Sequence, residues 1–129
     1  MSDPLMLRLE PSPSAVGRAR ATIDRFEGRL SARTIEDARL LVSELVTNSL
    51  RHASLEGNQE IEVSFSLDDR ALHVEVLDPG RGFSPRARTS READESGWGL
   101  FLVAQLADRW GVRHDGPTCV WFELDVGDR

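Results

Sequence analysis

The sequence has 129 residues, 40% of them apolar and 29% charged, which suits one compact domain with one core. Acidic residues outnumber basic ones by 22 to 16, and the net charge of −6 argues against a general nucleic-acid-binding or membrane-binding surface. The sequence contains no lysine, which excludes the Walker-type phosphate loop, a lysine Schiff base and the strand lysine of protein kinases. Because Cys119 is the single cysteine, no intrachain disulfide and no Cys-based zinc site can form.

The first half of the chain predicts one strand followed by two helices. Leu5, Leu7 and Leu9 alternate with other residues before two prolines, as in a short edge strand. From Ser14 the apolar spacing changes to three and four, which predicts an amphipathic helix. The apolar face of that helix is Val16, Ala19, Ile23, Phe26 and Leu30. A longer helix is predicted from about Ser31 or Thr34 to Ala53.

The second half returns to a spacing of two. Residues 61–67 and 72–76 alternate around Asp68-Asp69, which predicts a β-hairpin. Residues 79–99 have no apolar period, and 84–96 are expected to form a surface loop. A third helix is predicted from Leu100 to about Trp110, followed by short strands at 112–114 and 118–126. His73 and His114 are expected on strand surfaces, with Trp110 and Trp121 in the core or at its rim.

This order of elements favours an α/β sandwich, in which helices pack on one face of a mixed, largely antiparallel sheet. No stretch of the sequence approaches the roughly 18 apolar residues of a membrane span, and residues 1–14 show no basic segment followed by a long apolar run. We therefore expect a cytoplasmic protein made of a single domain over residues 1–129.

The longer helix carries polar residues at regular spacing. Glu44, Asn48 and His52 are four residues apart, so their side chains form one slanting stripe on the helix. An amide oxygen suits a hydrated hard cation, and a carboxylate one turn away can orient or deprotonate a nucleophile. The alternative is a solvated helix face with no chemical role.

Two glycine-bearing segments follow. Asp78 ends a predicted strand and precedes Gly80 and Gly82. Its carboxylate can accept a hydrogen bond from an exocyclic amine such as that of adenine. The glycines beside it let a flat ligand approach the backbone closely. Gly97 and Gly99 precede Leu100 at a helix start, where free N–H groups suit phosphate. Each segment alone is also compatible with an ordinary turn. Together with the polar stripe they indicate a nucleotide site that needs no lysine.

These motifs resemble the GHKL superfamily of ATPases and kinases over residues 5–126, nearly the whole chain. The stripe from Glu44 to His52 resembles the N box, and the segments from Asp78 and from Gly97 resemble the two glycine boxes. Gly116-Pro117-Thr118 resembles the Gly-Thr element that closes the adenine pocket. The resemblance implies a Bergerat-type ATP-binding fold, and it is closest to the bacterial anti-sigma-factor serine/threonine kinases.

By this resemblance, Glu44 would be the catalytic base and Asn48 a Mg²⁺ ligand, and Asp78 would anchor adenine with support from Thr118. The remaining nucleotide-contacting residues that it implies are Arg51, His52, Gly80, Gly82, Gly97, Gly99 and Leu100. The loop over residues 84–96 would act as the lid, although no phosphate-sensing arginine can be aligned within it.

The resemblance implies an ATP- and Mg²⁺-dependent kinase that phosphorylates a STAS-type anti-anti-sigma partner and sequesters a sigma factor. Relatives dimerise through the part of the fold that holds the first strand, so the leucines at 5, 7 and 9 form either an edge strand or a dimer seam. The resemblance implies no direct contact with nucleic acid or membrane. The alternative is a binding module in which ATP fixes the lid and no phosphate is transferred. A histidine kinase catalytic domain is disfavoured because 129 residues leave no room for the phosphoacceptor helices. A purely structural domain is the remaining possibility.

Overall fold

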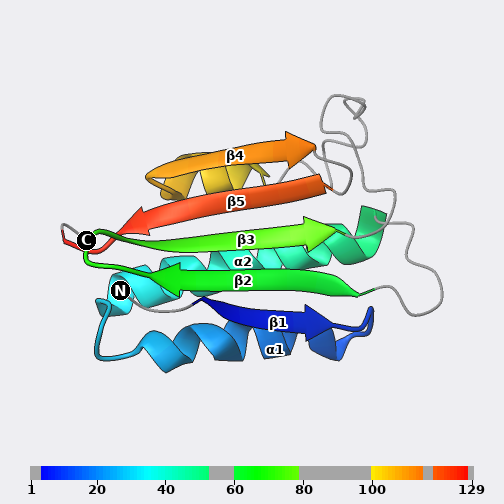
Figure 1. Cartoon of the computed structure of the whole chain (residues 1–129), viewed down its shortest axis with the longest axis horizontal. Helices are drawn as coiled ribbons and strands as arrows, with labels where there is room; N and C mark the ends of the chain where they lie inside the picture. Colours follow the sequence, from blue (N-terminus) through cyan, green and yellow to red (C-terminus); the bar gives the residue numbers. More distant parts are fainter. Residues whose placement is uncertain (1–3, 53–59, 79–99, 115–117, 128–129) are drawn as a thin grey trace.

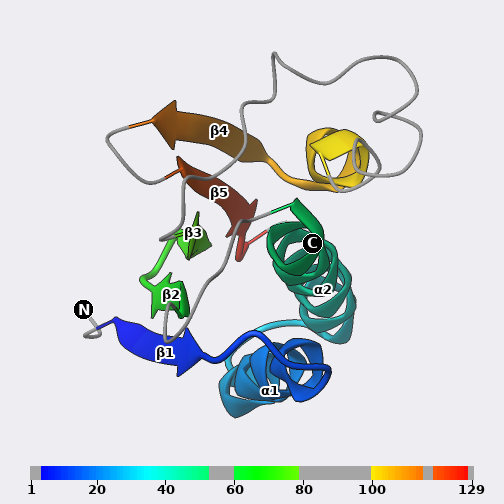
Figure 2. The same ribbon diagram turned by 90° about the vertical axis from the view of Figure 1, so that its right-hand side faces the viewer.

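Five antiparallel strands form one sheet, and the helices cover one of its faces (Figures 1 and 2). The computed structural model describes residues 4–52, 60–78, 100–114 and 118–127. The strands are β1 (Leu5–Leu9), β2 (Ile61–Leu67), β3 (Ala71–Asp78), β4 (Arg109–His114) and β5 (Thr118–Asp125), in the order β1-β2-β3-β5-β4. Every pairing between these described strands is antiparallel, so the α/β sandwich is confirmed, with a uniformly antiparallel sheet in place of a mixed one.

The helices are α1 (Ser14–Ile23), the short 3-10 helix η1 (Asp24–Phe26) and α2 (Ala32–His52). A further helical segment covers residues 100–106. The first helix is shorter than its apolar spacing predicts, because the chain turns at Gly28, whose φ of 89° favours glycine. Phe26 and Leu30 are nevertheless buried as expected.

The start of α2 is fixed by a side-chain cap. The Ser31 hydroxyl oxygen accepts a hydrogen bond from the Thr34 backbone N–H at 3.1 Å, and the Ser31 hydroxyl donates to the Thr34 hydroxyl at 3.0 Å. Such a cap satisfies one of the backbone donors that a helix leaves unpaired at its N-terminus. The prediction of a helix from about Ser31 is therefore confirmed, while its expected end at Ala53 lies outside the described residues.

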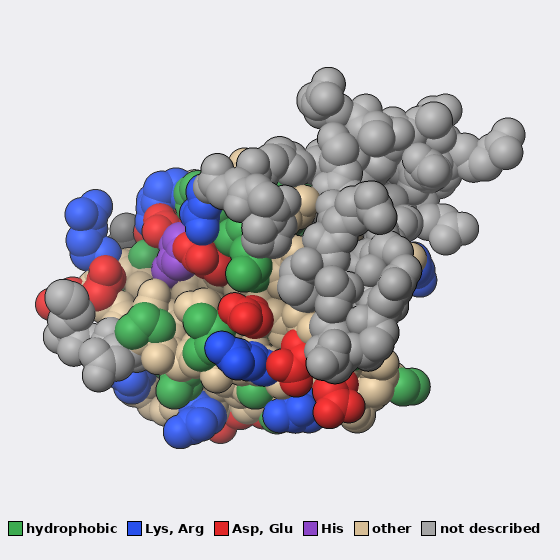
Figure 3. Space-filling view, turned by 45° about the vertical axis from the view of Figure 1, so that its right-hand side comes forward, with side chains coloured by type: hydrophobic (Ala, Val, Ile, Leu, Met, Phe, Trp, Pro, Cys, Tyr) green, Lys and Arg blue, Asp and Glu red, His purple; other side chains and the backbone are tan. Residues whose placement is uncertain are grey.

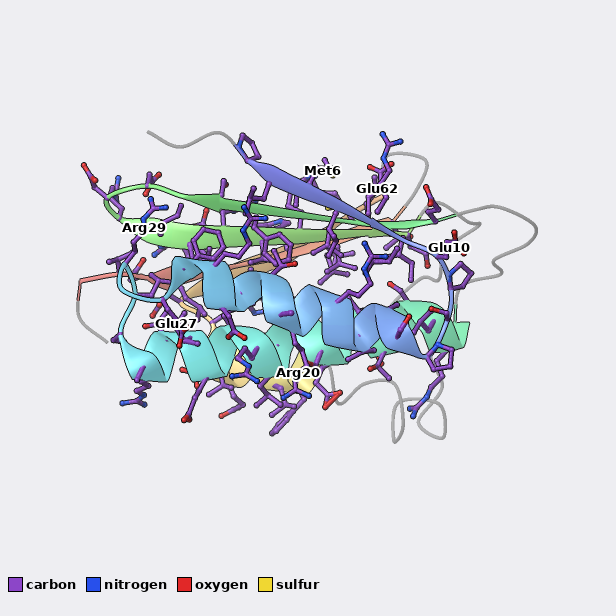
Figure 4. The ribbon with its side chains drawn as sticks, turned by 90° about the horizontal axis from the view of Figure 1, so that it is seen from below. Met6, Glu10, Arg20, Glu27, Arg29 and Glu62 are labelled. Carbon is purple, nitrogen blue, oxygen red and sulfur yellow. The ribbon has the colours of Figure 1, made fainter. Side chains whose placement is uncertain are left out.

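The core lies between α2 and the central strands. Alternate residues of β2 and β3 are buried and point toward the helices, as the spacing of two predicts. The largest fully buried side chains are Phe65, Phe122, Leu9, Ile23, Leu41, Ile61, Leu72 and Leu124. The opposite face of the sheet carries no helix among the described residues, and Figure 4 shows Met6 and Glu62 on that open side.

The third helix is shorter than predicted and β4 is longer. Helical structure ends at residue 106, and β4 begins at Arg109, so Trp110 lies in a strand and is 39% exposed. The backbone N–H of Asp108 donates to the carbonyl of Glu123 at 2.9 Å, and the Arg109 guanidinium pairs with Glu123 and Asp125. These contacts to β5 outcompete the helical continuation that the apolar spacing favours, so the prediction of a helix to Trp110 is wrong.

Truncating the core at Phe122 tests this packing. Phe122 is fully buried in β5 and pairs with Val74 of β3, so Phe122→Ala should lower the free energy of unfolding by about 3–5 kcal/mol. Urea unfolding followed by circular dichroism measures the change. The control is Met6→Ala on the open face, since Met6 is 57% exposed and should change stability by less than about 0.5 kcal/mol. Equal effects of the two substitutions would contradict the placement of the core.

Candidate nucleotide site

The polar stripe of α2 contains a buried residue, Asn48. Asn48 is 4% exposed although asparagine is seldom buried, whereas Glu44 is half-buried and Arg51 is exposed. His52 belongs to α2, but its side chain lies outside the described residues. Leu41 and Leu45 are buried beside the stripe and fix the rotation of the helix, so the stripe follows the border between the buried and the exposed side of α2.

Two further polar side chains are buried at one end of the sheet. Asp78 is the last residue of β3 and Thr118 the first of β5, and the two are cross-strand partners in the register. They are 1% and 4% exposed. Both continue the rows of β3 and β5 that point toward the helices, so the strand pairing places a carboxylate and a hydroxyl next to each other on the covered face.

The elements that carry these residues meet at one end of the molecule. The last turns of α2, the end of β3 and the start of β5 lie at the same end in Figures 1 and 2, and α2 contacts both strands. The described buried polar residues are Thr34, Asn48, Ser49, Asp78 and Thr118. Thr34 belongs to the cap at the far end of α2, and the other four belong to the three segments that meet here.

This gathering is informative because a buried polar group is costly unless it is hydrogen-bonded, and a buried carboxylate is costlier still. Hydrophobic residues of the same size would stabilise a purely structural layer more effectively. The position of Asn48, Asp78 and Thr118 within an otherwise apolar layer therefore fits a site that binds a polar ligand.

Glu44 has a different setting from the buried group. It lines a surface groove of about 600 Å³ on the outer side of α1 and α2, and Figure 4 shows Arg20, another lining residue, beside α2. The other residues lining the groove are Glu36, Asp37, Arg39, Leu40 and Ser43. Asn48, Asp78 and Thr118 do not line it. Glu44 is thus reachable from outside, one turn away from the buried Asn48.

The glycines of the predicted boxes are not placed. Gly80, Gly82, Gly97 and Gly99 lie outside the described residues, as does the predicted lid over 84–96. Leu100 is described: it opens the helical segment 100–106, and its half-buried side chain packs against the core. The structure therefore describes six of the predicted site residues with their side chains: Glu44, Asn48, Arg51, Asp78, Leu100 and Thr118.

The donor set fits a Mg²⁺ ion that is held largely by its nucleotide. Within the described residues, no group of three His, Cys, Asp or Glu side chains could hold a metal ion by itself. Mg²⁺ keeps several waters and usually takes one or two protein oxygens together with substrate phosphates. A single buried amide such as that of Asn48 can supply one such oxygen, so the chemistry of this residue is compatible with the ion.

Sequence reasoning missed an ion network on the open face of the sheet. His73, expected as an ordinary strand-surface residue, contacts Glu75 and Glu123, and these carboxylates are held in turn by Arg113 and Arg109. The spacing of two between His73 and Glu75 already placed them on one face of a strand. Predicting that Glu123 of β5 and the two arginines of β4 join this network required the order of the strands in the sheet, which the sequence did not reveal.

Comparison with known families identifies the class. A family model described as a histidine kinase-like ATPase domain matches residues 9–124. Among solved structures, the RsbU and RsbW domains of a Mycobacterium tuberculosis protein superpose with a TM-score of 0.75 at 22% identity, covering 97% of this chain and 33% of that one. The histidine kinase domain of an Erythrobacter litoralis blue-light-activated histidine kinase superposes with a TM-score of 0.61 at 24% identity, covering 88% of this chain and 60% of that one. In both cases the chain spans less than two thirds of the solved chain, and the likeness concerns the fold.

The chain belongs to the histidine kinase-like ATPase domain family, as its GHKL-type motifs suggested. Within that family it is 33% identical to the serine-protein kinase RsbW of Listeria monocytogenes serotype 4a, covering 100% of this chain and 91% of that protein. It is 29% identical to the serine-protein kinase RsbW of Bacillus subtilis, covering 99% and 89%. The resemblance to bacterial anti-sigma-factor kinases is thereby confirmed. No helix among the described residues is long and apolar enough to cross a membrane.

A substitution at Asp78 tests the buried group. Asp78→Asn keeps the size of the side chain and removes its charge, so ATP binding should weaken by about 10- to 100-fold if the carboxylate accepts a hydrogen bond from the adenine amine. Isothermal titration calorimetry with ATP and Mg²⁺ measures the affinity. Arg8→Gln, on the open face, is the control and should leave it unchanged. Wild-type affinity in Asp78→Asn would remove this residue from the site.

Proposed function

We propose that this chain is an ATP- and Mg²⁺-dependent serine/threonine kinase that phosphorylates a STAS-type anti-anti-sigma partner and sequesters a sigma factor. The observation that carries the proposal is the burial of Asn48, Asp78 and Thr118 where α2, β3 and β5 meet. Membership of the ATPase family and similarity to RsbW serine-protein kinases along nearly the whole chain support it. In this proposal the chain is a single ATP-binding domain acting in the cytoplasm, with dimerisation as a further expectation.

Each described residue then has a distinct task. Asp78 accepts a hydrogen bond from the adenine amine, and the Thr118 hydroxyl beside it on β5 supports that contact. Asn48 offers its amide oxygen to Mg²⁺. When bound, ATP would supply the transferable phosphoryl group, and its Mg²⁺ would neutralise the charge that develops on that group. Arg51 lies one turn from Asn48 on the exposed side of α2, where a guanidinium suits phosphate.

Glu44 is the proposed catalytic base. Its carboxylate would accept the proton of the partner's hydroxyl as that oxygen attacks phosphorus. Its position in a surface groove supports this role, because a folded protein substrate must reach the base from outside. The backbone of Gly80 and Gly82, that of Gly97 and Gly99 with Leu100, and the side chain of His52 complete the proposed nucleotide contacts.

A second candidate is a nucleotide-dependent binding module without phosphate transfer. The observation that favours it is the separation of Glu44, which lines an outer groove, from the buried group of Asn48, Asp78 and Thr118. In such a module, ATP would fix the partner-binding conformation, and Glu44 would have no chemical task.

Phosphotransfer by a Glu44 variant separates the two candidates. Glu44→Gln should lower the single-turnover rate of label transfer from γ-labelled ATP to a STAS-domain partner by about 10²- to 10⁴-fold, because the amide cannot accept the proton. ATP affinity, measured separately, should stay near that of the wild type. Glu36→Gln is the matched control, since Glu36 lies on the same helix and lines the same groove.

Three outcomes are informative. Transfer by the wild type, and its loss only in Glu44→Gln, support the kinase. Nucleotide-dependent capture of the partner with no transfer, unaltered in Glu44→Gln, favours the binding module. Full transfer by Glu44→Gln would exclude Glu44 as the base while leaving the kinase assignment in place.

A further inference from the structure

The open face of the sheet carries an ion network, defined as His73, Glu75, Arg109, Arg113 and Glu123. Its central contacts are made by the ring of His73: Nδ1 is 2.9 Å from Glu123 Oε2 and Nε2 is 2.8 Å from Glu75 Oε2. The three side chains are between 25% and 30% exposed, so they are largely shielded from water. In Figure 3, histidine (purple), acidic (red) and basic (blue) side chains gather together on the surface.

The network connects three strands. Glu75 and His73 belong to β3, and Glu123 is the cross-strand partner of His73 on β5. On β4, Arg109 Nε donates to Glu123 at 2.6 Å, and Arg113 donates to Glu75 at 3.2 Å and to the Cys119 sulfur at 3.4 Å. The ring of His73 also stacks on Trp121 of β5, with 5.5 Å between ring centroids. Edge strand β4 is therefore held to the sheet by side chains as well as by its backbone.

The carboxylates of the network are ionised at neutral pH. Burial raises the pKa of Glu75, but hydrogen bonds from His73 and Arg113 outweigh it and hold the pKa below its ordinary value. The hydrogen bond from Arg109 lowers the pKa of Glu123 despite partial burial, and His73 adds to the effect. Two ionised carboxylates are acceptors only, so both contacts of the ring can be hydrogen bonds only when each of its nitrogens donates.

We propose that His73 acts as a proton-dependent tie between β3 and β5: the ring serves both Glu75 and Glu123 only while both of its nitrogens carry a proton. When one proton is lost, a ring nitrogen with a lone pair faces a carboxylate, and the two repel. Two other groups lie near the ring. Ser66 is the cross-strand neighbour on β2, and Asp68 lines the same cavity of about 300 Å³ as His73 and Glu123.

Asp68 cannot relieve the repulsion because it is itself an acceptor. Its carboxylate accepts hydrogen bonds from the backbone N–H groups of Arg70 and Ala71, and these lower its pKa. Arg109 and Arg113 reach the carboxylates of the network from β4 and do not contact the ring within the described hydrogen bonds. The proton on His73 therefore governs whether the β3–β5 tie is complete.

The sign of the pH dependence follows from these contacts. The lowered pKa values of Glu75 and Glu123 mean that their stabilising contribution is present above the ordinary carboxyl range and is lost as pH falls through the folded values. The contribution of the ring has the opposite sign, because its two contacts need a proton on both nitrogens. The network is therefore complete only where both carboxylates are ionised and the ring carries both protons.

A double-mutant cycle tests the tie directly. Unfolding equilibrium constants are measured for wild type, His73→Gln, Glu123→Gln and the double variant at pH about 5.5 and about 8.5. At the lower pH the two sites should be coupled by roughly fivefold in the unfolding constant, as for a partly exposed ion pair. At the higher pH the coupling should be clearly smaller, because a neutral ring can donate to only one of the two carboxylates. Arg8→Gln is the matched control, because the Arg8–Glu62 pair lies on the same face without a histidine and should give a pH-independent effect.

Coupling of equal size at both pH values would overturn the proposal, since the tie would then not depend on the proton. If a variant fails to fold, the wild type supplies a second readout through amide hydrogen exchange at Val74 and Phe122, which are paired across β3 and β5. Their opening constants should rise by roughly fivefold as the ring, followed by ¹⁵N NMR, loses its second proton. Opening constants that do not change with the protonation of His73 would also overturn it.

Discussion

The packing of α2 against β3 and β5 is the constraint on which the rest of the structure depends. Leu41, Val42, Leu45 and Val46 are buried in this contact, and removing such side chains from water is the dominant favourable term in folding. Because the apolar face of the helix is fixed, the position of Asn48 at the edge of the same face follows from the sequence spacing. The hydrophobic contact thus positions the polar group.

This arrangement explains how a chain without lysine can carry a nucleotide site. The Walker-type loop of other families places a lysine on a glycine-rich loop, whereas here the described polar residues belong to the helix and strands that form the core. Rigid placement lowers the ordering cost of binding. The energetic cost is a buried carboxylate at Asp78, which a bound ligand that donates hydrogen bonds would offset. The open face carries the opposite design, in which ion pairs at the border with water join the outer strand to the sheet.

Much of the fold could be predicted from the sequence, because apolar spacing of two or of three and four reports directly which residues face the core. The strands over residues 61–67 and 118–125 and the helix over 32–52 follow this rule. The end of α1 and the start of β4 could not be predicted in this way. Gly28 decides where the first helix region ends. The start of β4 is decided by contacts of Asp108 and Arg109 with β5, which join residues distant in sequence. In the candidate site, Asn48, Asp78 and Thr118 are buried where the motifs suggested a ligand site. The groove beside Glu44 depends on how the helices pack, and the ion network around His73 depends on the strand order. No single segment of the sequence specifies either of these.

The central claim is that residues of α2, β3 and β5 contact one nucleotide. The most direct measurement is NMR of the labelled chain titrated with Mg²⁺ and a non-hydrolysable ATP analogue, following the side-chain amide of Asn48 and the backbone amides of Asp78 and Thr118. The account predicts that all three signals shift together along one binding curve, while His73 on the open face stays unchanged. Saturation by the nucleotide with no change at Asn48, or with changes confined to the open face, would contradict it.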